Sequence, residues 1–145
     1  MIPLQNAVKK FKLNNISPEA TAAEALVRLV EHDFIPLLVP RKDRSDAFGI
    51  VTKHDIMHKV VAEGRDPREV KVSEIMAKPL IIVNDLSMDL RWASRMMHRC
   101  GIAALAVLDK GEFYGFITDR CIIEEYFDEL RRDKLDRSSG EMLSC

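Results

Sequence analysis

Two copies of one short motif constrain the fold of this chain more than any other feature. The first copy, Gly-Ile-Val-Thr-Lys-His-Asp-Ile, begins at Gly49, and the second, Gly-Phe-Ile-Thr-Asp-Arg-Cys-Ile, begins at Gly115, 66 residues further on. In the first copy the apolar residues change from strand spacing to helical spacing at Thr52, and in the second copy Thr118 opens the helix. The sequence therefore predicts two strands that each pass directly into a helix.

The segments that precede the two copies also repeat. A capping box, Thr21-Ala-Ala-Glu24, opens a helix before a short apolar strand over 35–39, and a helix from about Ser87 precedes a strand over 102–108. A unit this small cannot bury both faces of its sheet, so packing one sheet against the other is the economical solution. We predict an α/β (α+β) fold of two pseudo-twofold-related repeats, each a small β-sheet with two helices on one face, with the sheets packed together.

Breaks in the apolar pattern divide the chain into five parts. Gly64-Arg-Asp-Pro67 ends the helix of the first motif, because proline does not continue a helix, and a polar connector follows. We expect a lead-in segment over 1–16, a first repeat over 17–63, a linker over 64–79, a second repeat over 80–130, and a C-terminal helix end with a flexible tail over 131–145.

Helical spacing predicts which side chains face the core. The expected inward residues are Ala22, Ala25, Leu26, Leu29 and Val30 in the first helix, Leu90, Ala93 and Met97 in the helix of the second repeat, and Ile122, Ile123, Tyr126, Phe127 and Leu130 in the last helix. We also expect Cys100 and Cys121 to be buried, since the sequence places no base beside either thiol.

Composition excludes several classes of function. A net charge of −1 argues against a general nucleic-acid binder, which needs a basic surface. No apolar run approaches the roughly 20 residues of a membrane span, and the first residues lack the regions of a signal peptide. The three cysteines form no Cys-x-x-Cys pair, which fits a reduced cytoplasmic location.

Two interpretations of the corner at Thr52 stay open on this motif alone. The free amides of a helix N-terminus can receive an anion, but Thr52 and Asp55 also form an ordinary capping box that binds nothing. His54 and His58 have the spacing of a zinc pair, with Asp55 between them. Glutamate is usual at that middle position and no third ligand follows from the sequence, so we expect no metal site and no catalytic residue.

The doubled motif resembles a tandem pair of cystathionine β-synthase (CBS) domains, also called a Bateman module. The linker Val-Lys-Val-Ser-Glu-Ile-Met-Ala-Lys-Pro-Leu is similar to the segment that opens many second repeats, and the resemblance spans about 8–130. It implies a module that is not an enzyme, needs no cofactor and commonly forms a homodimer. It also implies a regulatory ligand, AMP, ADP, ATP or S-adenosylmethionine, in the clefts between the repeats.

The resemblance implies a first site around Asp55. Asp55 matches the family's ribose-binding position, Thr52 lies beside it, and Lys53 and His54 add positive charge for a phosphate. By the same analogy, the adenine would lie among residues from the linker and the second repeat, namely Met76, Ala77, Lys78, Pro79, Leu80, Ile102 and Ala103.

The second site departs from the family pattern. Thr118 is kept, but Cys121 stands where the ribose-binding aspartate belongs, and a thiol is a poor acceptor for a diol. Asp119 lies two residues earlier and therefore points about 200° away around the helix. The opposing segment would be Leu13, Asn14, Asn15, Ile35 and Pro36. We expect this site to be weaker or empty.

Two classes of function remain open at the level of sequence. The first is a regulatory module that senses an adenosyl ligand and transmits a conformational change to a separate effector protein. The second is a structural or dimerisation module that has kept the fold and lost the ligand.

Overall fold

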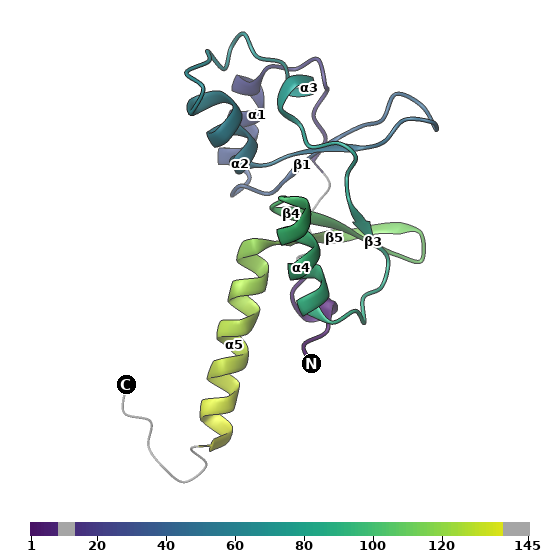
Figure 1. Cartoon of the computed structure of the whole chain (residues 1–145), viewed down its shortest axis with the longest axis vertical. Helices are drawn as coiled ribbons and strands as arrows, with labels where there is room; N and C mark the ends of the chain where they lie inside the picture. The colour runs from purple at the N-terminus through teal and green to yellow at the C-terminus, as the bar shows by residue number, and fades with distance from the viewer. Residues whose placement is uncertain (9–13, 138–145) are drawn as a thin grey trace.

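The computed structural model describes residues 1–8 and 14–137, and the two repeats lie one above the other (Figure 1). The first repeat consists of α1 (Ala22–Glu31), β1 (Leu37–Val39), β2 (Gly49–Val51), α2 (Lys53–Ile56) and a π-helical turn, η2 (Met57–Val61). The second consists of β3 (Ile82–Val83), α4 (Leu90–Cys100), β4 (Ala104–Asp109), β5 (Glu112–Thr118) and α5 (Asp119–Arg137). A 3₁₀ turn, η1 (Leu4–Asn6), precedes the first repeat, and the short α3 (Val72–Ile75) lies between the two.

Each repeat contains an antiparallel hairpin formed by its predicted strands. β1 pairs antiparallel with β2, while β4 pairs antiparallel with β5 and parallel with β3. The turn between β4 and β5 has positive φ at Lys110 (53°) and Gly111 (80°), the backbone conformation that suits a two-residue hairpin turn.

The segment after α3 joins the sheet of the first repeat at the edge nearest Thr52. Ile50 and Ala77 exchange two backbone hydrogen bonds, of 3.0 and 2.8 Å. A Cβ at Gly49 would lie 2.9 Å from Met76 Sδ and 3.3 Å from the Cβ of Val39. Glycine therefore lets this segment approach β2 closely enough to bring Ala77 beside the strand-to-helix corner.

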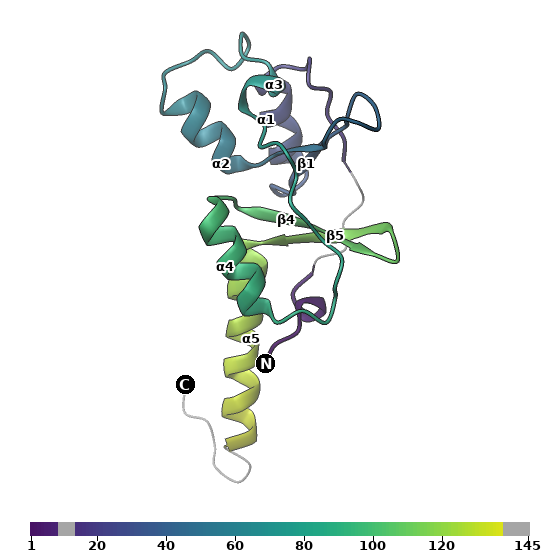
Figure 2. The same ribbon diagram turned by 45° about the vertical axis from the view of Figure 1, so that its right-hand side comes forward.

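The two sheets pack face to face, as the repeat predicted. Between them lies an apolar layer formed by Leu38, Ile50, Leu80, Ala104, Ala106 and Phe116. The helices cover the outer faces, so that α1, α2 and α3 lie beyond the first sheet and α4 and the start of α5 beyond the second (Figure 2). Leu4 and Ala7, from the N-terminal segment, complete the core of the second repeat.

The predicted inward faces are correct for one helix and partly wrong for two. Leu90, Ala93 and Met97 of α4 are buried. In α1, however, Leu26 and Val30 are exposed, because that helix contacts its core through a narrower stripe containing Ala22, Ala25 and Leu29.

The largest correction concerns α5. Ile122 is buried, but Ile123 (70% exposed), Phe127 (57%) and Leu130 (62%) are not, and Tyr126 is also exposed. The physical reason is that α5 contacts the second repeat near its N-terminal end and then projects away from both sheets (Figures 1 and 2). Cys121, at that end, is buried as expected, whereas Cys100 is exposed at the end of α4.

Within residues 1–8 and 14–137, no helix is both long and apolar enough to cross a membrane.

Candidate ligand-binding site

A cavity of about 640 Å³ lies between the two repeats, a volume typical of small-molecule sites. The first repeat contributes Ile50, Thr52, His54, Asp55, His58 and Lys59 to its lining, and Ala77 follows α3. The second repeat contributes Ser94, Met97, His98, Gly101, Ile102, Ala103, Ala104, Asp119, Ile122 and Ile123. A molecule in this cavity would therefore contact both halves of the chain.

Asp55 is the buried carboxylate of the cavity. The residue is 9% exposed and lies in the first turn of α2. Its Oδ2 accepts a hydrogen bond of 2.8 Å from the backbone N–H of Thr52 and lies 3.3 Å from the Thr52 hydroxyl. The helix start thus orients the carboxylate through one of its oxygens and leaves Oδ1 for other partners.

Lys59 contacts the second oxygen of this carboxylate. Its Nζ lies 3.0 Å from Asp55 Oδ1 and donates a 2.8 Å hydrogen bond to the carbonyl oxygen of Ile75 in α3. Lys59 lies within η2, and π-helical turns of this kind are frequent at functional sites.

Three histidines give the rest of the cavity its polar character. His54 and His58 stack with ring centroids 6.0 Å apart and an interplanar angle of 12°, and His98 enters from α4. His54 Nε2 lies 3.4 Å from Asp119 Oδ2, which links the two repeats when the imidazole is protonated. Among the described residues no three His, Cys, Asp or Glu side chains are grouped to hold a metal ion.

The structure brings together only some of the residues expected at the first site. Thr52, His54, Asp55, Ala77, Ile102 and Ala103 line the cavity; Lys53, Met76, Lys78, Pro79 and Leu80 do not. Local contacts explain two of these absences: Met76 packs against Gly49, and Leu80 belongs to the layer between the sheets.

The two lysines expected at the first site have other partners. Lys53 lies over the Phe34 ring, 5.7 Å from its centroid, at a second and smaller pocket. Lys78 Nζ lies 2.6 Å from Asp46 Oδ1 in the loop between β1 and β2. The backbone amide of Lys42 and the Lys78 ammonium lower the pKa of Asp46 to about 2.

The second cleft is much smaller, with a volume of about 60 Å³. Ile35, Pro36, Thr118 and Asp119 line it, whereas Asn14, Asn15 and Cys121 do not, and Leu13 lies outside the described residues. Asp119 lines both this cleft and the larger cavity.

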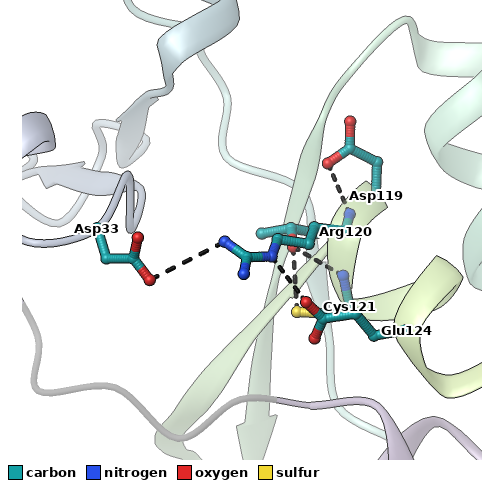
Figure 3. A network of polar contacts seen from close by, with 6 residues as sticks. Asp33, Asp119, Arg120, Cys121 and Glu124 are labelled. Carbon is teal, nitrogen blue, oxygen red and sulfur yellow. Dashed lines mark hydrogen bonds and ion pairs between the residues drawn. The ribbon is translucent and has the colours of Figure 1, made fainter. Parts of the chain in front are cut away.

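The helix start of the second repeat makes its own polar contacts (Figure 3). The Cys121 N–H donates to Thr118 Oγ1 at 3.2 Å, and the Thr118 hydroxyl lies 3.0 Å from Cys121 Sγ. Arg120 contacts Glu124 at 2.7 Å and reaches Asp33 of the first repeat at 3.9 Å. The thiol at the position of Asp55 therefore serves the helix start and does not face the second cleft.

Sequence reasoning missed Lys59, His58 and His98 as cavity residues. Lys59 could have been found, because it lies four residues after Asp55 and side chains at that spacing share a helix face. His98 could not, since no local pattern tells which turn of α4 faces the cavity.

Comparisons with known proteins establish the family. The family model for the CBS domain matches the chain twice, over residues 3–62 and 72–128. The chain belongs to the CBS-domain family. This CBS pair is 33% identical to MK0525, an uncharacterized Methanopyrus kandleri protein, over 109 residues, which are 74% of the chain and 55% of MK0525. It therefore spans little more than half the length of that relative.

Two other proteins are similar to this CBS pair. The CBS domain-containing protein YhcV of Bacillus subtilis is 29% identical over 102 residues, which are 70% of each chain. The structure of a hexameric CBS-CP12 protein from bloom-forming cyanobacteria superposes with a TM-score of 0.74 at 26% identity, covering 97% of this chain and 88% of that one. The doubled CBS fold therefore extends across almost the whole chain.

Proposed function

We propose that this CBS pair is a regulatory module that binds an adenosine-containing ligand, such as AMP, ADP, ATP or S-adenosylmethionine, in the cavity between its repeats. The observation that carries the proposal is the position of Asp55, a buried carboxylate at the wall of a cavity of about 640 Å³. A carboxylate accepts hydrogen bonds from both hydroxyls of a ribose, and charge-assisted bonds of this kind are the stronger ones.

The remaining walls of the cavity suit the other parts of such a ligand. An adenine can pack against an apolar wall formed by Ile50, Ala77, Ile102 and Ala104. His54, His58 and His98 supply donors for a phosphate, most strongly when they are protonated. Lys53 lies over the Phe34 ring and Lys78 pairs with Asp46, so neither lysine belongs to the proposed site.

A ligand in the cavity would act on the packing between the repeats. Because both repeats line the cavity, a ligand that prefers one arrangement of them shifts the chain toward that arrangement. We propose that a separate effector protein responds to this shift, and that the module works in a reducing compartment such as the cytoplasm, where the free thiols of Cys100 and Cys121 persist.

We also propose that the module is a homodimer in which α5 pairs with α5 of a second copy. Ile123, Tyr126, Phe127 and Leu130 form an exposed apolar stripe on this helix. Antiparallel pairing would lay this stripe of each helix against the same stripe of its partner and remove both from water.

Replacing Asp55 by alanine tests the ligand proposal. The loss of two hydrogen bonds to the charged carboxylate should weaken AMP binding by about 1.5–3 kcal/mol, roughly ten- to a hundredfold. Isothermal titration calorimetry measures the two dissociation constants, and thermal unfolding verifies that the variant is folded. Asp136→Asn, an exposed carboxylate on α5, is the control and should bind AMP like the wild type. Unchanged affinity in Asp55→Ala would refute the assigned role.

One observation favours the alternative of a structural module without a ligand. Thr52 and Lys59 already contact both oxygens of Asp55 within the chain itself. Thermal unfolding with AMP, ATP and S-adenosylmethionine separates the two functions, because a ligand at 100 times its Kd stabilises its protein by about 2.7 kcal/mol. A structural module would show no stabilisation by any of the three.

A further inference from the structure

The contacts of Asp55 raise a question of competition at the proposed site. Oδ2 is engaged by the backbone amide and hydroxyl of Thr52, and Oδ1 is engaged by Lys59 at 3.0 Å. The Thr52 contacts are part of the helix start and stay when a ligand binds. Each carboxylate oxygen accepts about two hydrogen bonds, so Oδ2 is filled and Oδ1 has room for one hydroxyl beside Lys59. A ribose that places both of its hydroxyls on Asp55 must therefore compete with Lys59 for the remaining position on Oδ1.

Lys59 is able to leave this carboxylate without leaving the cavity. Its side chain is about half exposed, and its ammonium is a point charge on a flexible four-carbon stem. The other basic groups of the cavity, His54, His58 and His98, are imidazoles, so Lys59 is the one ammonium among the described residues that line it. Asp119 is the second carboxylate of the lining, and it lies 3.4 Å from His54.

Whether the displaced Lys59 ammonium finds a new anionic partner depends on whether the ligand carries a phosphate. A phosphorylated adenosine brings its own anion, so Lys59 exchanges one negative partner for another. Unphosphorylated adenosine brings none, and the lysine then loses its ion pair with nothing in return. The same residue thus opposes an uncharged ligand and attracts an anionic one.

We propose that Lys59 is a specificity-determining residue that selects phosphorylated adenosine ligands over uncharged ones. It neutralises Asp55 in the free protein, yields Oδ1 to the ribose when the ligand binds, and then contacts the phosphate. This inference rests on the proposed adenosyl site and names the class of ligand for it, a nucleotide.

The test compares AMP with adenosine on wild-type protein and on Lys59→Gln by isothermal titration calorimetry. Glutamine keeps a donor for the Ile75 carbonyl but carries no charge. We expect AMP to bind Lys59→Gln about tenfold or more weakly, the loss typical of one charge-assisted hydrogen bond, while adenosine binds at least as tightly as to the wild type. The preference for AMP over adenosine should fall by about the same factor or more.

Two further variants keep the test decisive. Lys59→Arg retains the charge and should retain the preference for AMP. Lys42→Gln removes one positive charge from the exposed loop between β1 and β2, which lines neither pocket, and should leave both affinities unchanged. If Lys59→Gln does not fold, a preference retained in Lys59→Arg supports the proposal and a preference lost there overturns it.

Two different results would overturn the role of Lys59 and the adenosyl site, respectively. Equal weakening of AMP and adenosine in Lys59→Gln would show that Lys59 only supports the helix, and would overturn this inference while leaving the adenosyl site intact. Wild-type protein that binds neither compound would overturn the proposed function and this inference with it.

Discussion

At the scale of single residues, Asp55 combines a local structural task with a position at the cavity wall. It accepts a hydrogen bond from the Thr52 amide and so stabilises the start of α2, and the same carboxylate faces the space between the repeats. A helix start fixes the direction of its N-terminal side chains, since the backbone of the first turn is rigid. The capping box and a binding site are therefore compatible at this corner, and the sequence alone left both open.

Asp46 allows a prediction about pH. Its pKa of about 2 in the folded chain lies below the usual 3.8, because the Lys42 amide and the Lys78 ammonium favour the carboxylate. The stability that this group contributes is therefore present above its unfolded pKa and is lost as the pH falls through about 2. Asp46→Asn should make the free energy of unfolding less dependent on pH in this range, measured by urea titration at several pH values. An identical pH dependence in variant and wild type would contradict the assignment.

At the scale of elements, α5 shows what apolar spacing can and cannot predict. The pattern of Ile122, Ile123, Tyr126, Phe127 and Leu130 predicted a helix here, and the helix exists. Spacing does not distinguish a core from an interface between two chains, because both bury the same stripe. The strands were predictable because the repeated motif and the short apolar runs before it are local signals, whereas the projection of α5 depends on where the sheet beneath it ends.

The pairing of α5 gives a prediction at the same scale. Phe127→Glu places a charge in the middle of the exposed stripe, so the homodimer should dissociate to a monomer at concentrations where the wild type is dimeric. Sedimentation velocity measures the change. Ile82→Glu alters an exposed apolar side chain on β3, away from α5, and should leave the dimer intact. A wild-type monomer, or a dimer that survives Phe127→Glu, would contradict the pairing.

At the scale of the whole molecule, the repeat predicted the architecture, and the resemblance predicted part of the cavity. The residues on α2 follow from the motif at Gly49, and the comparisons with known CBS proteins agree with the doubled fold. The residues across the cavity, such as His98 and Ser94, follow from the position of α4 in the folded chain, which no local pattern encodes. The N-terminal segment was equally unpredictable, because Leu4 and Ala7 lie in the core of the second repeat without any clear period.

A crystal structure of the chain grown with AMP tests the account most directly. We predict the nucleotide in the cavity between the repeats, with both ribose hydroxyls within hydrogen-bonding distance of the Asp55 carboxylate and the adenine against Ile102 and Ala104. An empty cavity at saturating AMP, or a nucleotide bound away from Asp55, would contradict the account.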